Sequence, residues 1–242
     1  MKAVILLAGK GRRLTNFDKP KSLYSFYGKT LLSYLVDGLI DAGIKDIVPV
    51  VGFQADLILD FFKKNYPKLS IQPVYNHCYE YSNNLYSLCL AHYLVANDRF
   101  LLATGDLMVN PKIIQSMIKT KNSCIMIDDL RKQEIIDSPG TLVKRDRILD
   151  LGRHIPLKKN AGYAIGLYYF NKILSQAFFN QANELLKTEL NAGFHDPLCK
   201  LFNRYRVYPL STKGLSWTDL DDPEDIPKVK KIINQIQEEN KK

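Results

Sequence analysis

The chain has 242 residues, a length that a single hydrophobic core can support. Hydrophobic residues make up 46% and charged residues 24% of it, an ordinary globular composition that excludes a wholly disordered protein. With a formal net charge of +9, a polyanionic partner has to be considered, and nucleotide phosphates, nucleic acid and an anionic membrane all qualify, but charge alone decides nothing.

The cysteines and the first residues exclude several other classes of protein. The four cysteines lie far apart with no C-x-x-C pair, so neither a zinc site nor a disulfide framework is expected. The apolar start of the chain ends at Ala8, which is too short for a signal peptide or a membrane span. We therefore expect a cytoplasmic protein that does not insert into a membrane.

Apolar runs and helical spacings alternate in the first part of the chain. We expect strands over 3–8, 47–51, 69–74 and 99–104, and helices over 31–42, 55–64 and 84–96. The run 3–8 is apolar throughout, which is typical of a strand buried on both faces of a parallel sheet. The β-α-β alternation predicts an α/β fold with a doubly wound, mostly parallel sheet.

The second part of the chain is less regular. We expect short strands over 123–127, 141–144, 148–151 and 207–210, a longer strand over 162–170, and helices over 172–187, 195–203 and from Pro223 to about Glu238. A mixed sheet or a small subdomain is expected to begin in this part. Asp222 is expected to cap the last helix, with Pro223 in its first turn.

A glycine-rich loop, L-A-G-K-G-R-R-L over 7–14, follows the first expected strand. Ligands of open parallel sheets bind beyond the carboxyl ends of the strands, and glycines let the backbone approach a phosphate closely. A Walker P-loop requires Gly-Lys-Ser/Thr, but Gly11 follows Lys10. A dinucleotide fingerprint requires a third glycine where Leu14 stands. The loop is therefore either a polyphosphate site of another kind or a simple turn.

A second motif, P-K-S-L over 20–23, follows shortly afterwards. The pattern G-x-G-x-R-L followed by P-K-x-L resembles the nucleotidyltransferases that join a nucleoside triphosphate to a phosphorylated small molecule. The resemblance implies a GT-A-like Rossmannoid fold. It also implies that the glycine loop and its arginine hold the triphosphate (Leu7, Ala8, Gly9, Gly11 and Arg13), and that Lys21 contacts the reacting phosphates. Arg13 and Lys21 are the expected catalytic residues.

Carboxylates at two places suggest a metal site. Asp106 follows the expected strand 99–104, where the family resemblance implies a magnesium-binding aspartate. The stretch W-T-D-L-D-D-P-E-D over 217–225 resembles the second metal-binding motif of the family, in which Asp219 and Asp221 would share one face of an extended segment. We therefore expect Mg²⁺ on Asp106 with Asp219 or Asp221.

A polar and aromatic segment over 76–88 precedes an expected helix. It is most similar to a stretch of the bacterial CTP:phosphocholine cytidylyltransferases that ends N-N-x-Y-S-L. The match implies that Ser82, Asn83 and Asn84 lie near the nucleobase, and amide groups suit the donor and acceptors of cytosine. A capped loop with packing tyrosines is the structural alternative.

The acceptor-binding residues follow the family less closely. Related sequences often carry F/W-Y-E-D where this chain has Gly193-Phe194-His195-Asp196, so Asp196 is kept and a histidine replaces the glutamate. Acidic and aromatic groups would suit a choline ammonium, and we assign Tyr81, Tyr163 and Asp196 to the acceptor. His195 is expected at a helix cap or on the surface.

The sequence predicts one nucleotidyltransferase domain over 1–242, with a nucleotide-binding half over about 1–106 and an acceptor- and metal-binding half over about 107–242. The expected reaction transfers CMP from CTP to a phosphorylated acceptor, first of all phosphocholine, and needs no nucleic acid. Alternatives are a sugar-1-phosphate, aminoethylphosphonate or inositol-phosphate acceptor with CTP, UTP or dTTP. A non-catalytic nucleotide-binding regulator and a basic nucleic-acid-binding module are alternatives of a different class. The sequence gives no sign of oligomeric state.

Overall fold

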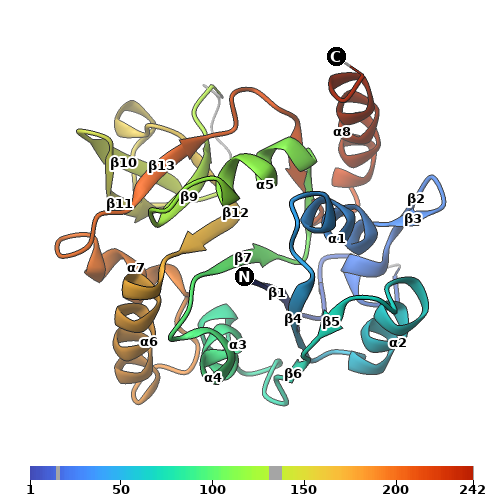
Figure 1. The fold of residues 1–242 in the computed structure, drawn as a ribbon, viewed down its shortest axis with the longest axis horizontal. Helices are drawn as coiled ribbons and strands as arrows, with labels where there is room; N and C mark the ends of the chain where they lie inside the picture. The colour runs from blue at the N-terminus through green and yellow to red at the C-terminus, as the bar shows by residue number, and fades with distance from the viewer. Residues whose placement is uncertain (15–16, 131–137, 242) are drawn as a thin grey trace.

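The computed structural model describes residues 1–14, 17–130 and 138–241. A ten-stranded sheet runs through its centre in the order β11-β10-β12-β7-β1-β4-β5, with β6 beside β4 and with β9 between β12 and β13 (Figure 1). Its strands are β1 (Lys2–Leu7), β4 (Asp46–Val51), β5 (Ser70–Ile71), β6 (Val74–Tyr75), β7 (Phe100–Thr104), β9 (Cys124–Asp128), β10 (Gly140–Lys144), β11 (Arg147–Gly152), β12 (Tyr163–Phe170) and β13 (Tyr208–Ser211). The strands from β7 to β5 are parallel, whereas β12 pairs antiparallel with both β7 and β9. The expected mixed, mostly parallel sheet is confirmed.

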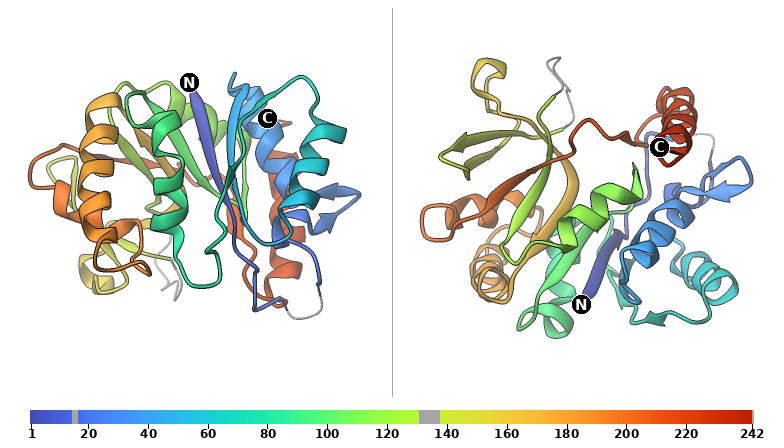
Figure 2. Two further views of the ribbon diagram at one scale, coloured as in Figure 1. Left: turned by 90° about the horizontal axis from the view of Figure 1, so that it is seen from below. Right: turned by 45° about the horizontal axis from the view of Figure 1, so that its top comes forward.

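Helices cover both faces of this sheet (Figure 2). They are α1 (Leu31–Asp41), α2 (Ala55–Asn65), α3 (Asn84–Leu90), α4 (His92–Val95), α5 (Pro111–Ile118), α6 (Lys172–Leu186), α7 (His195–Leu201) and α8 (Asp225–Glu239). The 3₁₀ turns are η1 (Lys21–Leu23) and η2 (Leu157–Lys159). Alternate residues of β1 enter different cores: Val4 packs with α3, α6 and α7, whereas Ala3 and Ile5 pack with α1, α2 and α5. The uninterrupted apolar run of β1 is explained by this burial on both sides.

Three elements depart from the boundaries expected from the sequence. The strand expected over 69–74 is divided into β5 and β6, because Pro73 between them has no N–H for the ladder. The helix expected over 84–96 breaks at Ala91 into α3 and α4. The last helix begins at Asp225, and the Asp225 carboxylate accepts the backbone N–H groups of Asp221 and Asp222. The expected cap at Asp222 is therefore wrong.

Two small sheets and the helix α5 were not among the elements expected from the sequence. The hairpin of β2 (Ser25–Phe26) and β3 (Lys29–Thr30) precedes α1, and β8 (Leu107–Val109) pairs antiparallel with β14 (Trp217–Asp219). Asp219 lies opposite Leu107 in this pairing, and the Leu220 N–H donates to the Asp106 carbonyl at 3.0 Å. The β8–β14 pair therefore brings the two acidic motifs together, although they are more than a hundred residues apart in the chain.

Close approach of two strand ends requires a glycine beside Asp106. Leu6 of β1 pairs with Thr104 of β7, and the Gly105 N–H donates to the Leu6 carbonyl at 3.1 Å. A Cβ atom on Gly105 would lie 2.5 Å from that carbonyl oxygen and 2.5 Å from a Leu7 methyl group. The absence of a side chain at 105 is therefore what lets Asp106 lie next to the glycine loop. Within the described residues, no helix is both long and apolar enough to span a membrane.

Candidate active site

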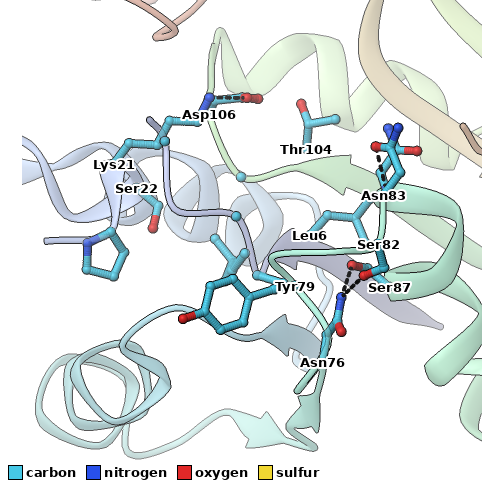
Figure 3. Close-up of a pocket in the computed structure, with 17 residues that line it drawn as sticks. Leu6, Lys21, Ser22, Asn76, Tyr79, Ser82, Asn83, Ser87, Thr104 and Asp106 are labelled. Carbon is cyan, nitrogen blue, oxygen red and sulfur yellow. Dashed lines mark hydrogen bonds and ion pairs between the residues drawn. The ribbon is translucent and has the colours of Figure 1, made fainter. Parts of the chain in front are cut away.

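A pocket of about 270 Å³ lies beyond the carboxyl ends of β1 and β7 (Figure 3). Three groups of residues line it: the glycine loop with the proline–lysine motif, the polar loop that leads into α3, and the end of β7. The expected nucleotide residues among them are Leu7, Ala8, Gly9, Gly11, Lys21, Ser82, Asn83 and Asn84. Arg13 is not in this lining. One pocket thus gathers four segments that the sequence associates with a nucleotide.

The glycine loop and Lys21 pack directly against each other. Gly11 has a φ of +64°, which favours glycine, and a Cβ atom there would lie 3.2 Å from the Lys21 Cβ. Gly9 faces open space in the pocket. The short turn η1, which follows Pro20, carries Lys21 back over the loop. Gly11 therefore makes room for the lysine stem, whereas Gly9 leaves room for a ligand.

Two cations of the N-terminal segment pair with carboxylates of the metal motifs. Lys21 Nζ lies 2.7 Å from Asp106 Oδ2 and 2.7 Å from Asp221 Oδ1. The Arg13 guanidinium lies 3.1 Å from Asp221 Oδ2 and 3.0 Å from Asp222 Oδ2. The structure therefore brings Arg13, Lys21, Asp106 and Asp221 into one ion-pair network.

Burial and charge shift the pKa values of this network. Burial alone would raise the pKa of Asp106, but the Lys21 ammonium lowers it below its usual value. Burial opposes the charge of Lys21, yet Asp106 and Asp221 outweigh it and raise its pKa. Lys228 Nζ lies 4.0 Å from Asp219 Oδ1, and burial together with the two other carboxylates raises the pKa of Asp219 to about 6. Negative charge therefore exceeds positive charge on the Asp219 side.

The carboxylates of this network fit a divalent cation. Within residues 1–14, 17–130 and 138–241, no three acidic, histidine or cysteine side chains already form a metal-binding group. Asp106 and Asp221 instead flank one cationic atom, Lys21 Nζ, and Asp219 lies close enough for them to raise its pKa. Mg²⁺ prefers one or two carboxylates together with phosphate oxygens and water. The site therefore offers suitable oxygen ligands around a position that already holds positive charge.

The sequence indicated no role for Asn76, which organises the polar loop of the pocket. Asn76 is almost fully buried, and its amide N–H₂ donates to Ser82 Oγ at 3.1 Å and to Ser87 Oγ at 2.9 Å (Figure 3). Its Oδ1 accepts the Cys78 N–H at 2.9 Å. Asn83 caps α3 through its own side chain. A polar residue directly after β6, at the carboxyl edge of the sheet, was the signal that could have identified Asn76.

We expect Asn76→Ala to lower the free energy of unfolding by about 1–3 kcal/mol, because the buried Ser87 hydroxyl and the partly buried Cys78 N–H lose a hydrogen-bonding partner. The loss also frees the segment that carries Ser82, so nucleotide affinity should fall. Urea unfolding and nucleotide titration measure the two effects. Ser87→Ala removes one of the same hydrogen bonds and is the matched control. Equal stability of Asn76→Ala and the unmodified chain would contradict this role.

A second cavity, of about 840 Å³, adjoins the first. The two cavities share four lining residues: Asn83, Asn84, Thr104 and Asp106. The second cavity also contains Asp219, a polar wall from β11 and the following turn, and the start of α7. Its charged and histidine side chains are Asp106, Asp150, Arg153, His154, His195, Asp196, Lys200 and Asp219. Thr104, which the sequence did not single out, lies at the junction of the two cavities directly before Gly105 and Asp106.

The three expected acceptor residues are not brought together. Asp196 lines the second cavity, where its Oδ2 accepts the Gly193 N–H at 2.9 Å. Tyr81 is 78% exposed in a turn, and Tyr163 is buried within β12; neither is among the residues that line the cavity. Tyr168 and Phe194 line it, but both are only 2% exposed. Of the three expected acceptor residues, only Asp196 therefore lines this cavity.

His195 is neither a helix cap nor a surface side chain. It is half-buried, its Nε2 lies 2.7 Å from the Tyr168 hydroxyl, and the ring of Phe194 packs beside it. Burial, with a smaller contribution from the charge of Arg153, lowers the pKa of His195 to about 4. The second cavity therefore has a neutral imidazole in its wall at pH 7.

The shifted pKa of His195 predicts a pH-dependent stability. Its ordinary pKa is near 6.5, so between about pH 6.5 and 4 the unfolded chain binds a proton that the folded chain does not. The free energy of unfolding should fall as the pH falls through this window, by at most about 1.4 kcal/mol per pH unit from this group. His195→Gln, which keeps a hydrogen-bonding partner for Tyr168, should show a smaller slope in urea unfolding. The same slope in both proteins would contradict the shift.

Residues 3–136, more than half of the chain, match the MobA-like NTP transferase domain. A CMP-5'-(3-aminopropyl)phosphonate synthase from Streptomyces rubellomurinus is 25% identical over 93% of this chain and 37% of its own length. A bifunctional IPC transferase and DIPP synthase from Aquifex aeolicus is 28% identical over 96% of this chain and 51% of its own length. The chain thus spans between about a third and a half of these relatives.

Solved structures agree with the fold. The inositol-1-phosphate CTP transferase from T. maritima superposes with a TM-score of 0.81 at 23% identity, covering 98% of this chain and 96% of that one. The CTP:phosphocholine cytidylyltransferase from Streptococcus pneumoniae superposes with a TM-score of 0.80 at 21% identity, covering 96% and 98%. At these identities the likeness establishes the shared fold, the GT-A-like nucleotidyltransferase architecture expected from the sequence.

Proposed function

Because the chain belongs to the MobA-like NTP transferase domain family, we propose that it transfers CMP from CTP to a small phosphorylated acceptor and releases pyrophosphate. The observation that carries the proposal is the pair of adjoining cavities that share Asp106. A reaction between two substrates needs a site for each and a common boundary where the reacting atoms meet. Asp106 lies at that boundary, and Lys21 Nζ lies 2.7 Å from its Oδ2 on the side of the first cavity.

The reaction we propose is a direct displacement. An oxygen of the acceptor phosphate attacks the α-phosphorus of CTP, the bond from that phosphorus to the bridging oxygen breaks, and pyrophosphate leaves. The acceptor phosphate is already an anion, so the step needs no side-chain base. Mg²⁺, held by Asp106 with Asp219 or Asp221, would supply charge neutralisation for the phosphates. We assign to Lys21 the stabilisation of charge around the α-phosphorus, and to Arg13 the binding of the terminal phosphates.

Cytosine is the base that we propose for the first cavity. The amide and hydroxyl groups of Ser82, Asn83 and Asn84 line it, and groups that both donate and accept hydrogen bonds suit the edge of cytosine. The names of one similar relative and of both similar structures refer to CMP or CTP. These names support CTP as the first nucleotide to test, with UTP and dTTP as the alternatives.

Phosphocholine remains the first acceptor to test, on the strength of the sequence resemblance and of Asp196 in the second cavity. The names of similar proteins support two of the alternative acceptor classes expected from the sequence, an aminoalkylphosphonate and an inositol phosphate. The cavity wall carries both acidic and basic side chains, among them Asp150, Asp196, Arg153 and Lys200, so charged amines and hydroxylated acceptors both find partners there.

A substrate matrix tests the proposal. Pyrophosphate release is measured with Mg²⁺ and each of CTP, UTP and dTTP, against phosphocholine, aminoethylphosphonate, inositol-1-phosphate and glucose-1-phosphate. We expect release with CTP and one of the acceptors, and none without an acceptor. Release with UTP or dTTP but not with CTP would overturn the assignment of the base. No release in any combination would overturn the proposed activity.

A further inference from the structure

Lys21 occupies the position between the carboxylates that the proposed reaction assigns to a metal ion. Its Nζ lies 2.7 Å from an oxygen of Asp106 and 2.7 Å from an oxygen of Asp221 (Figure 3 shows the Asp106 pair). The three side chains are only about a fifth exposed, at 21%, 22% and 19%. Charge pairs shielded in this way are screened by salt much less than surface pairs.

Arg13 also lies between two carboxylates, but it is closer to the surface than Lys21. Its guanidinium joins Asp221 to Asp222, so the two cations assigned to the triphosphate both pair with the acidic motif at 219–222. Arg13 is half exposed, and ion pairs of this kind contribute at most about 1 kcal/mol. The shielded Lys21 pair is therefore the stronger of the two contacts between the glycine loop and the acidic motif.

We propose that Lys21 is the internal counter-ion of the cation site: it neutralises Asp106 and Asp221 in the nucleotide-free chain and leaves them when a triphosphate binds. The proposal rests on the proposed function for the identity of the ligands, but it concerns binding rather than turnover. Its consequence is positive coupling, in which the triphosphate raises the affinity for the cation and the cation raises the affinity for the triphosphate.

The physical reason is competition for the same carboxylate oxygens. A divalent cation that enters the nucleotide-free site meets the ammonium group of Lys21 between the oxygens it needs, and like charges at such short range repel strongly. Phosphate oxygens of a bound nucleotide offer Lys21 new partners and release Asp106 and Asp221. By linkage, the coupling free energy is the same in both directions.

Mn²⁺ binding to the nucleotide-free protein tests the proposal, followed by electron paramagnetic resonance or calorimetry. Lys21→Met keeps the length of the side chain and removes its charge, so we expect it to bind Mn²⁺ at least about tenfold more tightly than the unmodified chain, within the range typical of coupled sites. Lys10→Met is the matched control. Lys10 belongs to the same loop, but its Nζ lies over the Phe53 ring, 5.5 Å from the ring centroid.

A non-hydrolysable CTP analogue, added without acceptor, gives the second half of the test. Once the analogue holds Lys21, we expect the tenfold advantage of Lys21→Met to shrink to less than about threefold. Unfolding curves verify that each variant folds. Lys21→Gln, which keeps N–H donors for both carboxylates, replaces Lys21→Met if the latter does not fold, and it should also bind Mn²⁺ more tightly.

Two results would overturn the inference: unchanged or weaker Mn²⁺ binding by the folded Lys21 variants, or equal tightening by Lys10→Met, which would indicate only the net charge of the loop. Failure of the proposed function is a separate result. If no pair of substrates gives pyrophosphate while Lys21→Met still binds Mn²⁺ more tightly than Lys10→Met, the counter-ion role of Lys21 stands without the cytidylyltransferase activity.

Discussion

Lys21→Ala is expected to lower the turnover of CTP by at least about 100-fold, the size typical of removing one preorganised electrostatic donor. The lysine is placed for this role by rigid surroundings: Pro20 and the turn η1 fix its backbone, and its stem packs over Gly11. Initial rates of pyrophosphate release, at saturating CTP and Mg²⁺, measure the effect per folded molecule.

The Lys21→Ala experiment needs a control for charge and one for folding. Lys10→Ala removes the same charge from the neighbouring loop and should keep turnover within about fivefold, since the charge of Lys10 acts on the phosphates only from a distance. Unfolding curves report whether the unpaired Asp106 and Asp221 destabilise the chain. Near-normal turnover of a folded Lys21→Ala protein would show that the lysine does not act on the reacting phosphates.

Asp106→Asn is expected to lower turnover by about 100- to 1000-fold, because it removes a charged oxygen ligand where both substrates meet. The change keeps the shape of the side chain, so the β8–β14 pairing, which uses the Asp106 carbonyl, should survive. We also expect the Mg²⁺ concentration for half-maximal rate to rise, and excess Mg²⁺ or Mn²⁺ to restore part of the rate. Rate measurements across a metal titration separate this effect from a general loss of structure.

Asp98→Asn is the matched control for Asp106→Asn. Asp98 precedes β7 whereas Asp106 follows it, so the same change of charge is made at opposite ends of one strand. Asp98 is exposed and its carboxylate accepts only the Arg99 N–H among the contacts described. We expect normal rates and a normal metal requirement for Asp98→Asn. A metal requirement that is unchanged in Asp106→Asn would contradict the assignment of Asp106 to the cation.

Local patterns predicted most of the central sheet. The strand β1 and the alternation of strands and helices up to β7 were predictable because the spacing of apolar residues along the chain indicates which residues are buried. The helix α5 was missed although Asn110 caps it and Pro111 opens it, a signal that the sequence does contain. The strands β8 and β14 are three residues each, and they become strands only by pairing with each other across the molecule.

The candidate site was predictable where a motif fixes the backbone. Gly11, Lys21 and Asp106 lie together because each follows the carboxyl end of a strand or packs on such a loop. The acceptor residues were not predictable in the same way. Tyr81 is exposed, whereas His195 is half-buried against Tyr168. The burial of each side chain depends on partners that are distant in the sequence, so it could not be predicted from local patterns.

The positions of Asp219 and Asp221 show why alternation is a weak guide at the end of a strand. Two residues apart on an extended segment, they were expected to share one face. The strand β14 ends at Asp219, which lines the second cavity, and the chain then turns so that Asp221 meets Lys21 and Arg13. The two carboxylates therefore have different neighbours, and Asn variants of each should differ in their metal requirement.

Direct identification of the product tests the central claim, which is transfer of CMP to a phosphorylated acceptor. CTP and Mg²⁺ are incubated with the protein and a mixture of phosphocholine, aminoethylphosphonate and inositol-1-phosphate, and the products are resolved by ³¹P NMR and mass spectrometry. The account predicts one CDP-linked product (CMP-linked for the phosphonate), formed in equal amount with pyrophosphate and absent when the acceptors are left out. Intact CTP, or CMP and pyrophosphate formed without any acceptor, would contradict it.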